Sequence, residues 1–289
     1  MGLTLDEIML ANTPASFEPT LDYVVTKVAR FPFDKFSDAS NKLGTQMKAT
    51  GEVMSIGRTM EESLLKAMRS LETGVCHIYH KKFEDWTNDR LLEYIAEPTD
   101  DRLYAIAQLI RGGVDLVLIY NRTKIDMFFL EKFKNIVEFE RVVEAAPMDI
   151  EVLREAKRMG FSDKFIGQLW GVSQHDMYLL REKNGIFPVY KMIDTCASEF
   201  SSYVPYFYST YEDENESLVS DKEKIVVLGS GPIRIGQGVE FDYSTVHAIW
   251  SIREAGYEAI IIKQQSPRPS RRTTPPATNS TSNPSRSRT

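Results

Sequence analysis

The stretch Gly51-Glu52-Val53-Met54-Ser55-Ile56-Gly57-Arg58-Thr59-Met60-Glu61-Glu62 decides the first part of the fold, because the apolar period changes within it. Residues 52–56 predict a strand that is bounded by two glycines. Thr59 can then cap a helix whose first turn carries acidic residues near the positive end of the helix dipole. The apolar residues that follow, at helical spacing, are Leu64, Leu65, Met68 and Leu71. With a second strand over residues 22–28, residues 1–72 are predicted to be mixed α/β.

Helical patterns dominate from residue 73 to about residue 200. Cap and stop residues divide this part of the chain into short helices. The predicted helices begin at Thr99-Asp100-Asp101, residue 125, Asp149, Ser162 and Ser173, and glycines at 112–113, 160, 171 and 185 stop four of them. The helix over 125–142 carries Phe128, Phe129, Phe133 and Ile136 as its apolar positions. Short helices at close spacing favour a small all-α domain.

A different unit follows an acidic segment at residues 211–224, which we interpret as a solvated linker and as the best domain boundary. Residues 225–228 predict a buried parallel strand. The glycine-rich loop 229–238, a helix over about 244–254 and the strand 259–262 follow it. This order is the opening of a βαβ unit.

Charge and cysteine content limit the class of protein. The net charge is −6, but residues 263–289 carry six basic residues and no acid, so the remainder carries −12. An acidic body disfavours nonspecific nucleic-acid binding. Two cysteines do not make a disulfide framework and favour the cytoplasm. Neither a secretory signal nor an apolar run of membrane-spanning length is expected.

Three local motifs have a functional and a structural interpretation. The glycine loop lacks dinucleotide or P-loop spacing, so a tight turn and a phosphate contact stay equal alternatives. Residues 162–185 resemble a helix-turn-helix, but the charges of residues 173–184 cancel, which favours packing over DNA recognition. Cys76, His77 and His80 are close together without a second pair of ligands, so we expect no metal site there.

Several stretches together resemble the large chain of carbamoyl phosphate synthetase. They are Thr13-Pro14-Ala15-Ser16-Phe17-Glu18-Pro19 with Asp22-Tyr23, Gln46-Met47-Lys48 with Gly51 to Arg58, Gly160 to Asp163, Tyr190 to Glu199, and Gly229 to Tyr243. The match covers residues 1–262. It implies a fold class of α/β plus all-α.

The resemblance also implies a division of the chain. Residues 1–72 resemble the truncated C-terminal part of the first ATP-grasp domain, and residues 73–215 resemble the helical oligomerisation domain. Residues 216–262 resemble the start of the second synthesis half, a partial βαβ unit. Residues 263–289 are expected to be a disordered basic tail.

The family makes carbamoyl phosphate from bicarbonate, glutamine-derived ammonia and two ATP, in arginine and pyrimidine biosynthesis. The resemblance implies Mg2+ or Mn2+ and potassium as cofactors of the parent enzyme, a glutamine amidotransferase small subunit as partner, and self-association through the helical domain. It places the nucleotide and metal groups before Gly2 and after Ile262. No catalytic, cofactor-binding or metal residue is therefore expected in this chain.

Four residues resemble family positions that border the internal passage for intermediates. They are Glu52, Arg234, Gly238 and Glu240. The alternative is that Glu52 and Glu240 are structural partners of nearby backbone donors or of an arginine.

The tail departs from the family. After Ile262 the family continues Asn-Pro-Glu-Thr-Val-Ser-Thr-Asp, whereas this chain has Lys263 to Ser266 and then Pro267. We hypothesise a reading-frame error, because codons for residues 267–284 can be chosen so that a shifted frame gives the family continuation. Two nearby single-base slips are needed, and the nucleotide sequence tests the idea. The alternative is a genuine basic tail.

We therefore predict an inactive fragment of a cytoplasmic ligase, with no nucleic-acid or membrane partner. The alternatives are a non-catalytic helical scaffold and, less favoured, a helix-turn-helix DNA-binding protein.

Overall fold

The computed structural model describes residues 2–10, 13–14, 16, 18, 20–36, 38–194, 206–217, 219–229, 233–234 and 238–262, and the structural statements below concern these residues. Residues 9–10, 13–14, 233–234 and 238–242 are described by their backbone alone. The predicted tail 263–289 and the segment around Cys196 lie outside the described residues.

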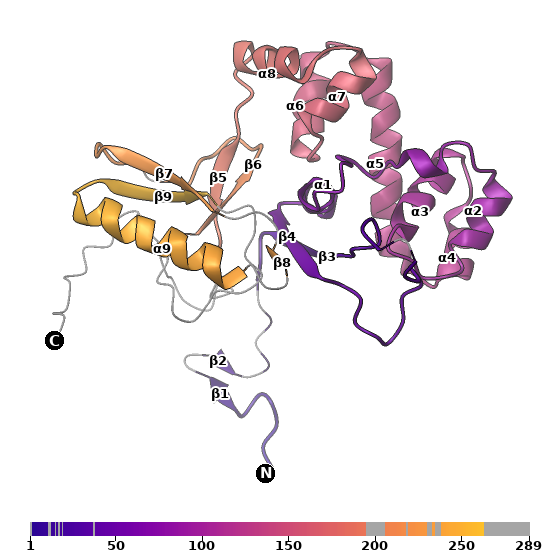
Figure 1. Cartoon of the computed structure of the whole chain (residues 1–289), viewed down its shortest axis with the longest axis horizontal. Helices are drawn as coiled ribbons and strands as arrows, with labels where there is room; N and C mark the ends of the chain where they lie inside the picture. Colours follow the sequence, from indigo (N-terminus) through magenta and orange to yellow (C-terminus); the bar gives the residue numbers. More distant parts are fainter. Residues whose placement is uncertain are drawn as a thin grey trace.

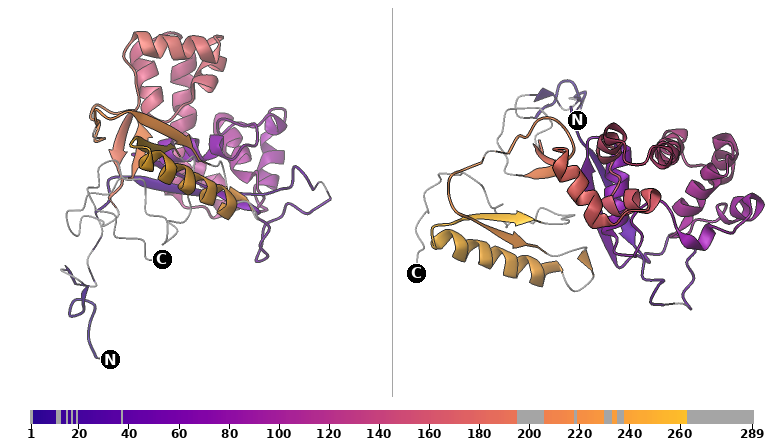
Figure 2. Two further views of the ribbon diagram at one scale, coloured as in Figure 1. Left: turned by 60° about the vertical axis from the view of Figure 1, so that its left-hand side comes forward. Right: turned by 90° about the horizontal axis from the view of Figure 1, so that it is seen from above.

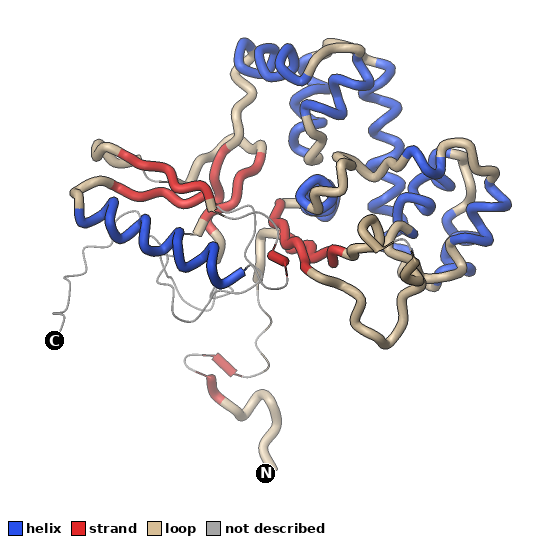
Figure 3. Tube along the Cα trace, viewed as in Figure 1, coloured by secondary structure: helices blue, strands red, loops and turns tan. Residues whose placement is uncertain are grey.

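The helices between residues 60 and 183 gather on one side of the molecule, and the helix over 238–254 lies on the other side with the strands over 224–228 and 258–262 (Figure 1; Figure 3). The helices are α1 Met60–Ser70, η1 Lys81–Phe83, α2 Asn88–Tyr94, α3 Arg102–Arg111, α4 Leu116–Thr123, α5 Met127–Ala145, α6 Ile150–Arg158, α7 Asp163–Trp170, α8 Gln174–Lys183 and α9 Gly238–Glu254. The strands are β1 Met9–Leu10, β2 Thr13–Pro14, β3 Val24–Arg30, β4 Gly51–Gly57, β5 Val189–Met192, β6 Phe207–Thr210, β7 Lys224–Leu228, β8 Ile233–Arg234 and β9 Glu258–Ile262.

The first predicted strands are confirmed and pair with each other. β3 and β4 run antiparallel, with Val24 opposite Gly57 and Arg30 opposite Gly51. The hydroxyls of Ser55 and Ser63 lie in the buried seam between β4 and α1, where the Ser55 hydroxyl donates to the Ser63 carbonyl at 2.5 Å. Helix α1 begins where predicted, and the Thr59 hydroxyl accepts a hydrogen bond from the Glu62 amide.

Most predicted helices are confirmed at their caps. Asp149, Ser162 and Ser173 each accept hydrogen bonds from amides in the first turn of α6, α7 and α8. The 19-residue helix α5 is the longest described helix and runs past α1, α3, α4, α6 and α7. Helices α2 and α4 were not among the sequence predictions.

A single apolar core joins β4 and α1 to the helices. Side chains without exposed surface, or nearly so, extend through this core from β4 to α8; they are Val53, Leu65, Met68, Leu109, Leu130, Ile136, Leu153, Ile166 and Met177. Burying a side chain of this size stabilises the fold by about 1.5–3 kcal/mol. The strand before residue 72 and the helices after it are therefore one packed body.

The prediction of helix as far as residue 200 is wrong for its last described part. β5 and β6 form an antiparallel pair, with Val189 opposite Thr210 and Met192 opposite Phe207. Tyr190 lies in β5, in a part of the chain that was predicted to be helical. Aromatic and β-branched residues favour strand here, because they pack against cross-strand neighbours.

The C-terminal unit is βαβ, as predicted. β7 and β9 pair in parallel from Lys224–Glu258 to Leu228–Ile262, and α9 packs against both (Figure 2). Helix α9 begins about six residues earlier than predicted. The expectation of a buried β7 is wrong, since Leu228 is 77% exposed and Val226 is 49% exposed. Two strands and one helix leave one face of this sheet uncovered in the described residues.

Candidate interaction site

The structure brings two of the four predicted passage residues together. β4 pairs antiparallel with β8, so that Gly51 lies opposite Arg234 and Glu52 lies opposite Ile233. Gly238 and Glu240 lie in the first turn of α9, four to six residues further along the chain. The side chains of Arg234 and Glu240 lie outside what is described.

Glu52 has a structural partner within its own sheet. Its Oε2 atom lies 2.9 Å from Lys27 Nζ on β3, and both side chains are partly exposed. The alternative interpretation named a backbone donor or an arginine as the partner of Glu52, whereas the observed partner is a lysine. Pairs at this exposure contribute about 0–1 kcal/mol, so it does not preclude a further role for the carboxylate. The passage assignment stays a prediction.

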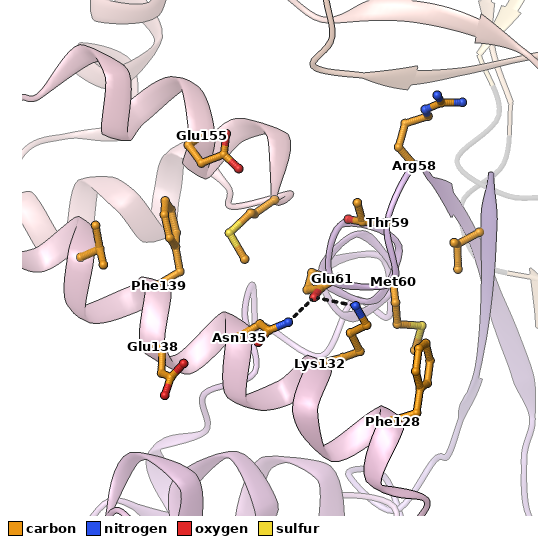
Figure 4. Close-up of a pocket in the computed structure, with 13 residues that line it drawn as sticks. Arg58, Thr59, Met60, Glu61, Phe128, Lys132, Asn135, Glu138, Phe139 and Glu155 are labelled. Atoms are coloured by element: carbon orange, nitrogen blue, oxygen red, sulfur yellow. Dashed lines mark hydrogen bonds and ion pairs between the residues drawn. The ribbon is translucent and has the colours of Figure 1, made fainter. Parts of the chain in front are cut away.

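A groove of about 730 Å3 lies between α1, α5 and the end of α6. It has two apolar ends: Met60 and Phe128 lie at one end and Phe139 lies at the other (Figure 4). Val24 on β3, Val142 near the end of α5 and Met159 after α6 also line the groove. Phe128 and Val142 are 52% and 45% exposed, which is high for residues of their type. Of the apolar positions identified on this helix, Ile136 is fully buried, whereas Phe128 and Phe129 are exposed.

A polar bridge crosses the floor of the groove. Glu61 in the first turn of α1 is only 6% exposed, and its Oε1 atom accepts a hydrogen bond of 2.9 Å from Asn135 Nδ2. Lys132 Nζ lies 3.4 Å from the same oxygen (Figure 4). From the sequence, Glu61 was expected only to face the positive end of the helix dipole. Its partners on α5 lie 71 and 74 positions further along the chain, so a short stretch of sequence does not indicate these contacts.

His77 belongs to a buried ionic cluster. Its Nε2 atom lies 2.8 Å from Glu140 Oε1, and its ring stacks on Phe165 at 3.7 Å. Arg111 reaches both oxygens of Glu140 at 2.7 Å. Burial lowers the pKa of His77 and favours the neutral ring. Although burial alone would raise it, hydrogen bonds from Arg111 and His77 hold the pKa of Glu140 below its usual value.

This cluster gives His77 a packing role. No group of three or more His, Cys, Asp or Glu side chains gathers as a metal site within the described ranges. A neutral imidazole between a carboxylate and two phenyl rings ties the segment before η1 to α5 and α7. Its partners lie 63 or more positions away along the chain, so no local pattern indicates this role.

A second buried cluster joins α6, α7 and α8. Asp163 accepts hydrogen bonds from Lys157 Nζ at 2.8 Å and from Arg181 Nη2 at 2.7 Å. The ring of Tyr211 lies 5.0 Å from Lys157 Nζ and 5.6 Å from the Arg181 guanidinium carbon. Arg181 is therefore used in packing, which removes a positive charge from the face of α8 that DNA reading would need.

We expect the stability of the chain to rise between pH 8 and pH 10.5 because of Lys157. Burial, opposed by Asp163, lowers the pKa of this amine from 10.5 to about 8. The unfolded chain then binds more protons than the folded chain across that window, so stability increases with pH at up to roughly 1.4 kcal/mol per unit. Urea unfolding of the wild type and of Lys157→Met at pH 8, 9 and 10 measures how the free energy of unfolding changes with pH.

Other titrating groups cancel in the comparison of these two proteins. The wild type should gain stability relative to Lys157→Met as the pH rises. Equal slopes for the two proteins would show that the Lys157 amine has an ordinary pKa.

Most of the described acidic segment is exposed, as predicted, but three of its carboxylates also pair with basic side chains. Glu212 Oε1 lies 3.0 Å from Arg58 Nε, Asp213 pairs with Arg158, and Glu216 Oε1 lies 3.1 Å from Lys191 Nζ. Lys66 Nζ also donates to the Ser209 carbonyl at 2.5 Å. We name residues 207–216 the strap, because these contacts bind them to the helices and to β5.

The described residues thus form a helical body with an open apolar groove, buried ionic clusters and a strap that leads into a parallel α/β unit. A groove with apolar ends and a charged rim suits contact with another protein surface. None of the described helices has the length and hydropathy of a membrane-spanning segment.

Two family models match the chain. The model described as carbamoyl-phosphate synthetase large chain, oligomerisation domain, matches residues 52–185. The model described as carbamoyl phosphate synthase preATP-grasp domain matches residues 221–271. Together they cover more than half of the chain, and both describe the same enzyme in the order that the resemblance implied. The class is therefore a helical oligomerisation module joined to the beginning of an α/β domain.

The chain belongs to the carbamoyl-phosphate synthetase large-chain family, whose enzyme is a ligase. The first match begins at Glu52, which agrees with the single core shared by β4, α1 and the helices. The division at residues 72, 215 and 262 stays a prediction.

Proposed function

We propose that this chain provides the self-associating helical part of a carbamoyl phosphate synthetase large chain. The parent enzyme would make carbamoyl phosphate from bicarbonate, glutamine-derived ammonia and two ATP, for arginine and pyrimidine biosynthesis in the cytoplasm. The observation that carries the proposal is the order of the two matches, an oligomerisation domain at 52–185 followed by a preATP-grasp domain at 221–271.

We further propose that the chain does not turn over ATP by itself. The resemblance assigns the nucleotide and metal groups of both synthesis halves to sequence before Gly2 and after Ile262. Phosphoryl transfer needs metal ions and cationic groups that hold the reacting phosphates in place. ATP, Mg2+ or Mn2+ and potassium would then belong to the parent enzyme, together with a glutamine amidotransferase small subunit.

The β4–β8 pairing supports a place for Glu52 and Arg234 beside the internal passage. The strand contact joins the glycine-rich loop of the C-terminal unit to the edge of the first sheet. A passage between two synthesis sites has to cross between such units. Gly238 and Glu240, at the start of α9, follow the paired residues directly.

Self-association and turnover can be measured on the purified chain. We expect a mass that rises with concentration in sedimentation equilibrium between micromolar and hundred-micromolar protein. In the same samples we expect no phosphate release from ATP above the protein-free rate, with bicarbonate, ammonium, Mg2+ and potassium present.

The two measurements test separate parts of the proposal. A monomer at every concentration would contradict the assembly function. Bicarbonate-dependent ATP hydrolysis, lost in a heat-denatured control, would contradict the absence of a nucleotide site.

A further inference from the structure

The face of helix α5 that lines the groove has a similar order of residue types on either side of Asn135. The residues along it are Phe128, Lys132, Asn135, Glu138 and Val142. Large apolar side chains stand at both ends, and charges of opposite sign stand between them. Figure 4 shows Lys132 and Asn135 pointing toward Glu61 from α5, with Phe128 beside Met60. Glu138 and Val142 also line the groove.

This order is self-complementary when two copies of α5 run antiparallel. A twofold axis through Asn135 sets each residue opposite the one equally far on the other side of Asn135. Phe128 then faces the partner's Val142, and Lys132 faces the partner's Glu138. Each contact occurs twice. A parallel arrangement would instead set lysine against lysine and glutamate against glutamate.

We propose that a second copy of this chain docks its α5 antiparallel into the groove, with the twofold axis at Asn135. The proposal rests on the self-association proposed above and names the surface that performs it. The partner's Phe128 would lie at the groove end formed by Phe139, Val142 and Met159, and Phe128 would lie at the same place on the partner.

The charged residues are available for this contact. The Lys132 ammonium has three donors, of which Glu61 engages one at 3.4 Å, and its side chain is 29% exposed. The Glu138 side chain is 56% exposed, and among the described residues its ion pair is a long contact of 3.5 Å to Lys134 on the same helix. Each can therefore accept a partner without losing a buried hydrogen bond.

The charge pattern provides a specific test with the full chain. Lys132→Glu and Glu138→Lys each create two like-charge contacts in the homodimer, so each should weaken dimerisation at least tenfold in Kd. An equimolar mixture of the two variants should dimerise at the wild-type concentration, because both cross-contacts are then opposite in charge. Sedimentation equilibrium measures all four samples, and circular dichroism with thermal unfolding verifies that each variant is folded.

Phe128→Ala has a matched control in Phe129→Ala. Both rings are exposed and contact each other at 5.4 Å, but only Phe128 lines the groove. Phe128→Ala should weaken dimerisation at least tenfold, and Phe129→Ala should change it less than threefold.

The outcomes separate the two proposals. A wild-type chain that never associates would remove both of them. A wild-type dimer that is unaffected by Lys132→Glu, Glu138→Lys and Phe128→Ala would overturn this surface and leave self-association standing. Single variants that dissociate without recovery in the mixture would overturn the antiparallel arrangement.

Discussion

Gly160→Ala should destabilise the chain by about 3–5 kcal/mol, because it combines backbone strain with a steric clash. Gly160 has a φ of +90°, which residues with a side chain rarely adopt. A Cβ atom there would lie 2.8 Å from Glu62 Cα and 3.0 Å from the Glu62 carbonyl oxygen. These are backbone atoms at the first turn of α1, so relief requires α1 and the end of α6 to separate.

Gly171→Ala is the matched control. Gly171 has a φ of +68° at the end of α7, but a Cβ atom would meet nothing within 4 Å. We expect a loss of about 1–2 kcal/mol from the left-handed conformation alone. Urea unfolding monitored by tryptophan fluorescence gives both values. Equal losses would show that α1 does not pack tightly against Gly160.

Asp163→Ala is expected to cost about 3–5 kcal/mol, because it leaves two buried cations without their counterion. The side chains of Lys157 and Arg181 are 7% and 10% exposed, and both bond to Asp163. Burial alone would raise the pKa of Asp163, but Lys157 and Arg181 hold it below its usual value. The stabilisation is therefore present above the pKa of an unfolded aspartate and is lost as the pH falls through the folded pKa.

Asp213→Ala provides the comparison, because this aspartate also pairs with an arginine but its side chain is 90% exposed. Its loss should change the free energy of unfolding by less than about 0.5 kcal/mol. Chemical unfolding at pH 7 measures both variants. A cost below about 1 kcal/mol for Asp163→Ala would contradict the inference that Lys157 and Arg181 depend on Asp163 as their buried counterion.

Elements with local signals could be predicted from the sequence. Thr59, Asp149 and Ser162 are caps whose hydrogen bonds lie within three residues, so a short window contains the relevant information. The parallel pairing of β7 and β9 followed from two apolar runs separated by a helix.

The β5–β6 pair was missed although a signal existed. Tyr206, Phe207 and Tyr208 are three consecutive aromatic residues, Thr210 is β-branched, and Val189 in the partner strand is also β-branched. Aromatic and β-branched residues favour strand over helix. The neighbouring helical patterns outweighed them.

The groove and the ionic clusters could not be predicted, for a different reason. Their contacts join residues far apart in sequence, as between Glu61 and Asn135 or His77 and Glu140. A charged residue in an amphipathic helix gives the same pattern whether it faces water or a buried partner. Whether such a residue faces water or a buried partner is decided by the packing of α1 and α7 on α5.

The strap limits how far the C-terminal unit can travel. Glu216 is fixed to Lys191 and to the Met192 amide, and β7 begins eight residues later at Lys224. Eight residues span at most roughly 28 Å when fully extended. The start of β7 therefore stays within that distance of Glu216, and the β4–β8 pairing holds the same unit to the first sheet, so a displacement of β5 would carry the parallel sheet with it.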